Sequence, residues 1–229
     1  MVPQGRRGKS VLSLVGLLTL LVALLTGCTG IGIGGTAGSG TVKTETRQVS
    51  GFSRVSFSGV GALNVTQTGK ESLTISAEDN LLPLLTSTVS GDTLTLGVKP
   101  GDSIRPTKSI VYTLTVAKLD GVSLSGAGSI SAQGIKTTAL SVRLSGAGSM
   151  TMGGSAQSQT VELSGLGSYQ AKGFQTASTD VTISGAGSAT VSASQTLNAV
   201  VSGAGSVTYY GSPQVTKSVS GVGSVKQGQ

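Results

Sequence analysis

The sequence contains no tryptophan and no histidine, and aromatic residues make up only 3% of its 229 residues. Without aromatic anchors, a core must be built from small aliphatic side chains stacked in rows along one axis, which favours a repeat protein. Without histidine, the chain lacks the side chain used most often in general acid–base catalysis, and a metal site is also disfavoured. We therefore expect no metal, no cofactor and no catalytic residue.

Cysteine occurs once, as Cys28, so no disulfide framework is expected. Arg6, Arg7 and Lys9 precede an apolar run over residues 11–25, the pattern of a signal peptide. The motif Leu25-Thr26-Gly27-Cys28 resembles the lipobox of bacterial lipoproteins, in which cleavage precedes the cysteine and its thiol carries a diacylglycerol. The alternative is a transmembrane anchor, but the apolar run is shorter than the roughly 18 residues that a span needs. We predict a signal peptide over residues 1–27 and membrane attachment through a lipid on Cys28.

Acylation of Cys28 leaves the mature chain without a thiol for metal binding or nucleophilic chemistry. Loss of three of the 16 basic residues with the signal peptide leaves 13 basic against 9 acidic residues. These charges are scattered and are not interleaved with aromatic residues, which argues against nucleic-acid binding. Because Thr29 is not the aspartate of an inner-membrane retention signal, we expect an exported lipoprotein of the cell envelope, at the outer membrane or the cell surface.

Two segments of different composition follow Cys28. Residues 28–41 are rich in Gly, Ser and Thr, which predicts a flexible tether between the lipid and a domain. Residues 42–118 hold short alternating apolar segments separated by Gly, Asp, Asn and Pro, as in strands and turns. Only residues 79–85 have the composition of a helical turn, and Pro83 limits its length. We expect one domain over residues 42–229.

The strongest pattern is an internal repeat over residues 119–229. The motif Ser-Gly-X-Gly begins at Ser58, Ser125, Ser145, Ser164, Ser184, Ser202 and Ser220. Residues one and three positions before this serine, and five and seven positions after it, are apolar except for Lys217 and Gln227 in the final copy. This alternation predicts a strand on each side of a Gly corner, and the two polar residues suit an end coil that blocks edge pairing.

A repeat of 18 to 20 residues cannot bury its own apolar rows, so successive copies must stack about 4.8 Å apart. Each copy then consists of a strand, a Gly corner, a second strand and a loose segment of Gly, Ser and Thr that leads back to the start. The sequence therefore predicts an all-β fold, a parallel β-helix or β-solenoid with coils of about 18–20 residues.

The glycines of the motif have a predicted structural role at the corners. A sharp turn favours a positive φ, and stacked corners leave little room for a Cβ atom. We expect the residue between the two glycines to turn inward. The corner glycines of the regular repeats are Gly126, Gly128, Gly146, Gly148, Gly165, Gly167, Gly185, Gly187, Gly203, Gly205, Gly221 and Gly223.

Two interpretations remain open for the serine that follows each corner. These serines form either a hydroxyl ladder that binds glycan or ice, or a set of caps for backbone groups of the turns, and capping is favoured. Threonine residues form no comparable row in the sequence. The serines are Ser129, Ser149, Ser168, Ser188, Ser206 and Ser224.

Solenoids also host enzymes that cleave polysaccharides, and glycoside hydrolysis needs two carboxyl groups across the scissile bond. Beyond residue 119 the acidic residues are few, and Glu162 and Asp180 do not lie at matched positions of their repeats. The candidates there for stacking on sugars are Tyr169, Tyr209 and Tyr210. The sequence favours a protein that is not an enzyme.

The chain resembles the family named putative auto-transporter adhesin, head GIN domain. The resemblance covers roughly residues 44–226 and rests on RQVSGF at 47–52, DNLL at 79–82, GDTLTL at 91–96 and the Ser-Gly-Ala-Gly repeats. It implies a right-handed β-helix on the cell surface. The family often carries Asp after the second motif glycine, where this chain has Ser or Ala62, so no acidic binding row is carried over.

Together these features predict a non-catalytic, lipid-anchored envelope protein that serves as a surface structural or adhesion module. The alternative is an envelope β-helix that binds or cleaves carbohydrate. The expected partners are the membrane, through the lipid on Cys28, and an envelope or host glycan or protein, but no nucleic acid.

Overall fold

A computed structural model of the chain describes residues 34–229. The predicted signal peptide, the lipobox and Cys28 lie outside these residues. Gly35–Gln229 forms one compact unit that is almost entirely β-structure. Within the described residues, no helix has the length and hydrophobicity needed to span a bilayer.

The elements follow one another as short strands in the N-terminal half and longer ones in the repeats. A single 3-10 turn, η1, spans Leu82–Leu84 within the stretch predicted to hold a helical turn. The strands are β1 (Thr36–Ala37), β2 (Val42–Arg47), β3 (Arg54–Phe57), β4 (Ala62–Gln67), β5 (Ser72–Glu78), β6 (Leu85–Ser90), β7 (Thr93–Val98), β8 (Ile104–Arg105), β9 (Val111–Val116), β10 (Gly121–Leu124), β11 (Ser129–Leu144), β12 (Ser149–Leu163), β13 (Ser168–Ile183), β14 (Ser188–Val201), β15 (Ser206–Tyr210), β16 (Gln214–Val219) and β17 (Ser224–Gln227).

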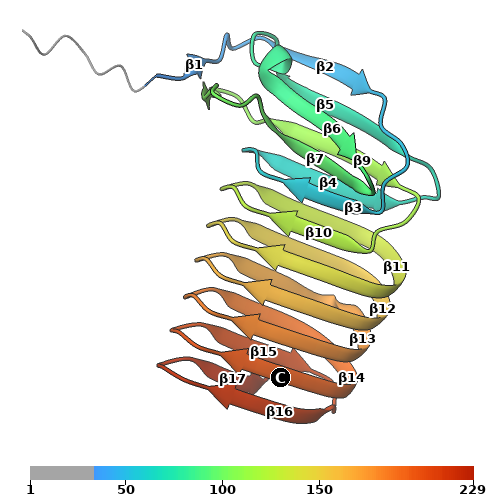
Figure 1. Ribbon diagram of the computed structural model, residues 1–229, viewed down its shortest axis with the longest axis vertical. Coiled ribbons are helices and arrows are strands. Elements are labelled where there is room, and N and C mark those ends of the chain that lie inside the picture. The colour runs from blue at the N-terminus through green and yellow to red at the C-terminus, as the bar shows by residue number, and fades with distance from the viewer. Residues whose placement is uncertain (1–33) are drawn as a thin grey trace, which may run out of the picture. The chain divides into compact units, whose positions relative to one another are not determined.

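The repeats stack as parallel coils, as Figure 1 shows from β10 to β17. Each strand pairs in parallel with the equivalent strand of the next copy, so like residues lie side by side. Val142, for example, pairs with Val122 on one side and Val161 on the other. This register confirms the predicted β-solenoid.

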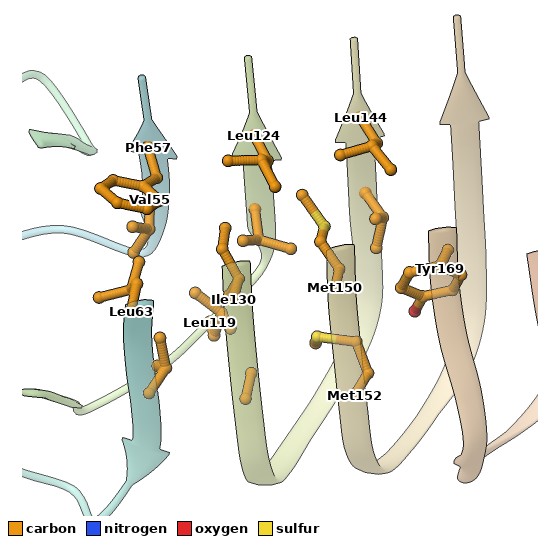
Figure 2. Close-up of a cluster of buried hydrophobic side chains, with 14 of the residues drawn as sticks. Val55, Phe57, Leu63, Leu119, Leu124, Ile130, Leu144, Met150, Met152 and Tyr169 are labelled. Atoms are coloured by element: carbon orange, nitrogen blue, oxygen red, sulfur yellow. The ribbon is translucent and has the colours of Figure 1, made fainter. Parts of the chain in front are cut away.

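The core consists of the apolar rows inside the stack. Figure 2 shows Phe57, Leu124 and Leu144 on one wall facing Leu63 and Ile130 on the other. All five side chains are at most 2% exposed. Because burial of each such side chain is worth about 1.5–3 kcal/mol, the rows supply most of the cohesion of a fold whose described part contains no disulfide.

The return segments of the coils formed by β11 to β14 are not loose, so that prediction is wrong for them. In the following copy, residues 211–213 separate β15 from β16. After the corner, β11 to β14 run as continuous bent strands of 14 to 16 residues back to the next corner. Their pairing continues through the return segment with only local register shifts, such as the one between Ala132 and Ile135. Parallel ladders thereby satisfy backbone N–H and C=O groups that a loose segment would leave unpaired.

At the corners, the close approach of successive coils explains the glycines. A Cβ atom on Gly146 would lie 2.0 Å from the carbonyl oxygen of Gly126, and one on Gly148 would lie 2.1 Å from that of Gly128. The expected positive φ is wrong for the regular repeats except at Gly221. Lack of room, and not an unusual backbone conformation, therefore excludes other residues.

In the regular repeats the residue between the two glycines points outward, which corrects the expectation that it turns inward. In the first copy of the motif, Val60 is half-buried and packs against the core. Leu166 is 73% exposed and Val222 is 86% exposed. Both glycines lie against the preceding coil, so the corner can project only its middle side chain into solvent. We call this row the corner ridge; its members are Ala127, Ala147, Leu166, Ala186, Ala204 and Val222.

The N-terminal end of the stack departs from the parallel pattern. Strands β3 and β4 belong to the first coil, and β7 and β9 pair with them in parallel. Antiparallel partners then follow, with β6 on β7 and with β5 and β2 beyond β9. These strands cover the first coil in Figure 1, whereas β16 and β17 form the last coil at the other end.

The domain begins before Val42, so the predicted tether is wrong for residues 35–41. Strand β1 pairs with β8, and the backbone N–H of Gly40 donates a hydrogen bond of 2.7 Å to the carboxylate of Glu78. Glu78 is fully buried and also accepts hydrogen bonds from the hydroxyl and N–H of Thr107 and the N–H of Lys108. This carboxylate therefore joins the N-terminal segment to the loop after β8.

The hydrogen bonds set the charge state of Glu78. The Thr107 hydroxyl has the largest effect, and with the backbone N–H groups it outweighs burial and lowers the pKa of Glu78 from 4.5 to about 2. Glu78 is therefore an internal anion, whereas the neighbouring Asp79 accepts a hydrogen bond from the Ser39 hydroxyl and forms an ion pair with Lys43.

The corner contact predicts a specific sensitivity to substitution. In Gly146→Val the new side chain would meet the Gly126 carbonyl, so we expect the free energy of unfolding in urea to fall by about 1–3 kcal/mol. Ala147→Val adds a similar side chain on the exposed corner ridge and should change stability by less than about 0.5 kcal/mol. Equal losses in the two variants would contradict the close contact.

Glu78 predicts a loss of stability in acid. Its pKa is lower in the folded than in the unfolded chain, so its contribution is complete above about pH 4.5 and is lost as the pH falls toward 2. We expect Glu78→Gln to unfold at lower urea concentration than the wild type at pH 7. The gap between the two proteins should shrink from pH 4.5 to pH 2, and comparing them cancels the effect of other carboxyl groups. A gap that stays constant over this range would disprove the role of the charged carboxylate.

Candidate ligand-contact face

The strands that follow the corners carry two outward rows of polar side chains, which are uncharged except for Lys226 in the last coil. The rows alternate with buried residues such as Ile130 and Met150, so the pleat turns them away from the core. We call the two rows together the hydroxyl face. The first row is Ser129, Ser149, Ser168, Ser188, Ser206 and Ser224; the second row is Asn64, Ser131, Thr151, Gln170, Thr190, Thr208 and Lys226.

Register pairing holds the members of each row one coil apart, at about 4.8 Å. Ser131 pairs with Asn64 and Thr151, and Thr190 pairs with Gln170 and Thr208. The second row was missed in the sequence because no single residue type occupies it throughout. Its signal is positional, six residues after each motif serine, where every side chain is polar.

The serines of the first row do not cap the turns, which corrects the favoured interpretation. Their backbone N–H groups donate to the coil below, as from Ser149 to the carbonyl of Gly128 at 3.3 Å. Ser168 accepts hydrogen bonds from Ser188 at 3.4 Å and from the Gln170 amide at 2.9 Å. Within residues 34–229 the side chains of the hydroxyl face make no other hydrogen bond, so most of their polar atoms face solvent.

The hydroxyl face continues onto the corner ridge. A shallow depression of about 440 Å³ lies where the two meet. Its lining includes Ser129, Ser149 and Ser168 of the first row and Ala127, Ala147 and Leu166 of the corner ridge. The combined surface offers hydroxyl and amide groups beside a narrow apolar ridge. It carries no acidic side chain, and its one charged residue is Lys226 at the last coil.

Glu162 and Asp180 lie on strands that precede the corners, and Asp120 lies directly before β10. Glu162 forms an ion pair of 3.0 Å with Arg143, and both side chains are at least half exposed. Asp180 pairs in register with Thr160, whereas Glu162 pairs with Thr182, so the two carboxylates occupy different rows. Asp120 lies 2.6 Å from both the Lys118 ammonium and the Thr137 hydroxyl.

A second shallow groove runs past this ion pair over the pre-corner strands. It has a volume of about 340 Å³, and its lining includes Ser123, Arg143, Glu162 and Thr182. Among the described residues, no three acidic residues or other metal-binding side chains cluster as a metal site would need.

The tyrosines proposed as sugar-stacking residues have different environments. Tyr169 is fully buried, where burial raises its pKa and its hydroxyl accepts a hydrogen bond from Gln159, so it offers no surface to a ligand. Tyr209 and Tyr210 are half-buried near the C-terminal end. The Lys172 ammonium lies 4.1 Å from the centre of the Tyr210 ring, a cation–π contact.

Comparison with known proteins identifies relatives of this chain. The model of the family described as putative auto-transporter adhesin, head GIN domain matches residues 51–213. No curated protein matches the sequence.

Solved structures share the fold over nearly their whole length. A Bacteroides fragilis protein described as a putative adhesin is 26% identical, with a TM-score of 0.70, and the match covers 84% of this chain and 100% of that one. A Parabacteroides distasonis protein described as a putative lipid binding protein is 21% identical, with a TM-score of 0.57 and coverage of 86% and 100%. A Parabacteroides merdae putative adhesin is 20% identical, with a TM-score of 0.54 and coverage of 85% and 99%. The last two matches show the fold alone.

Proposed function

The chain belongs to the family described as putative auto-transporter adhesin, head GIN domain, and we propose that it is a non-catalytic adhesion module of the cell envelope. In this proposal a lipid on Cys28 holds the protein at the membrane, and the hydroxyl face binds an uncharged polysaccharide. One observation carries the choice of ligand: two rows of solvent-facing hydroxyl and amide groups run in register across successive coils.

The chemistry of the hydroxyl face suits sugars. Hydroxyl and amide groups both donate and accept hydrogen bonds, as sugar hydroxyls do. A single such bond contributes only about 0.5–1.5 kcal/mol net, so useful affinity requires many contacts at once. A repeating surface can make many such contacts with a repeating polymer. Because the surface is shallow, a long polymer can lie along it.

Three features support binding without cleavage. Glycoside hydrolysis needs two carboxyl groups placed across one bond. The Glu162 carboxylate, however, forms an ion pair with Arg143. Glu162 also lies in a different row from Asp180, so the two carboxyl groups are not matched. The Bacteroides fragilis protein described as a putative adhesin is similar over its whole length.

Glycan binding tests the hydroxyl face directly. The purified mature protein should bind one or more neutral polysaccharides on an envelope and host glycan array. Replacing Thr151 and Thr190 with Arg should reduce that binding at least tenfold, because two bulky cations interrupt the second row. The control is the double variant Thr160→Arg/Thr182→Arg, whose positions face outward on the strands that precede the corners. This variant should bind the glycan as the wild type does.

Two results would overturn this part of the proposal. Equal binding by the two double variants would remove the hydroxyl face as the contact surface. Cleavage of a bound glycan, abolished by substitution of Glu162 or Asp180, would instead establish the carbohydrate-cleaving alternative.

The lipid anchor has its own test. Cys28→Ser removes the acylated thiol, so we expect the protein to leave the membrane fraction or to accumulate as an uncut precursor. Immunoblotting of membrane and soluble fractions measures both outcomes. Fractionation identical to that of the wild type would refute anchoring through Cys28.

A further inference from the structure

Three exposed basic residues lie on the loop between β7 and β9. Lys99, Arg105 and Lys108 form no ion pair within residues 34–229, whereas Lys43, Arg47, Arg54, Lys118 and Arg143 each have an acidic partner. Asp102 is the only acidic residue of the loop, which therefore carries a net positive charge. We call the three residues the basic patch.

The structure fixes Arg105 and Lys108 of the basic patch beside the segment that leads toward Cys28. The backbone N–H of Thr36 donates a hydrogen bond of 2.8 Å to the carbonyl of Ser103, and that of Gly38 donates one of 3.0 Å to the carbonyl of Arg105. In the other direction, the Arg105 guanidinium donates a hydrogen bond of 3.3 Å to the carbonyl of Gly35. The Glu78 carboxylate accepts hydrogen bonds from the backbone N–H groups of both Gly40 and Lys108, and so links this segment to the loop after β8. A Cβ atom on Gly38 would lie 1.9 Å from this carboxylate, so the segment packs tightly there.

Chain length then limits the distance to the lipid. Gly35, the first residue of the compact unit, lies seven positions after Cys28, and a chain of that length spans at most about 25 Å when fully extended. A domain held by so short a connection has its basic patch close to the bilayer surface.

We propose that the basic patch binds anionic phospholipid headgroups and so turns the N-terminal end of the solenoid toward the membrane. This inference rests on the lipid anchor of the proposed function. The occupant follows from charge complementarity, because the patch offers unpaired cations, and from the short connection to Cys28. Each Lys or Arg near an anionic surface strengthens binding roughly fivefold, so three together contribute on the order of 100-fold.

A vesicle assay without the lipid isolates the contribution of the patch. We would use the full mature chain carrying Cys28→Ser and vesicles of phosphatidylcholine, with or without phosphatidylglycerol. The protein should sediment with the vesicles that contain phosphatidylglycerol and not with phosphatidylcholine alone. K99Q/R105Q/K108Q should weaken this partitioning on the order of 100-fold, and added salt should do the same.

A second triple variant keeps the same net charge and serves as the matched control. Lys136, Lys172 and Lys217 are exposed and form no ion pair within the described residues, and they lie on β11, β13 and β16. K136Q/K172Q/K217Q should bind the vesicles as the parent does. Equal weakening in both triple variants, or no binding by the parent, would overturn the proposal. Urea unfolding of all three proteins checks that the substitutions leave the fold intact.

Chemical acetylation of the acylated protein tests the orientation. In vesicles with phosphatidylglycerol, Lys99 and Lys108 should react more slowly than Lys217 and Lys226, and the contrast should be smaller in phosphatidylcholine. Equal rates in both vesicles would overturn the orientation. A negative vesicle result would contradict only the basic patch. Unchanged fractionation of cells that carry Cys28→Ser would contradict only the lipid anchor, so the two proposals are tested separately.

Discussion

The close contact of glycine backbones at successive corners is the constraint on which the rest of the structure depends. A Cβ atom at Gly146, Gly165 or Gly185 would lie 2.0–2.4 Å from the carbonyl oxygen of the glycine below. Only glycine, which has no side chain, allows successive coils to come close enough for their strands to form parallel hydrogen-bonded ladders. The ladders then bring like side chains together, which produces the buried rows and the hydroxyl face by the same register.

Because of this shared register, the two faces of each strand have different roles. The inward rows of Val, Leu, Ile and Met remove apolar surface from water and stabilise the stack. The outward rows contribute little to stability and are free to vary in type as long as they stay polar. Ser131, Thr151, Gln170 and Thr190 illustrate this freedom, since four side chains of three residue types occupy equivalent positions.

The solenoid and its inward rows could be predicted from the sequence because period-two alternation and an 18- to 20-residue repeat are local signals. The outward direction of Leu166 could not, because it depends on contact between glycines of different coils. The role of Glu78 also escaped prediction, since its partners Gly40, Thr107 and Lys108 are 29 to 38 residues away. Of the candidate site, the serine row was visible as a repeat, whereas the mixed row became apparent only from strand pairing.

Stacking like on like also makes the fold modular along its axis. A whole coil inserted between two existing ones meets the same glycine corner and the same apolar rows above and below, so it creates no new kind of contact. Such an insertion would lengthen the outward rows by one step and leave their chemistry unchanged. Under the proposed polysaccharide binding, a gain or loss of coils would change the number of contacts with a long polymer without redesign of a binding pocket.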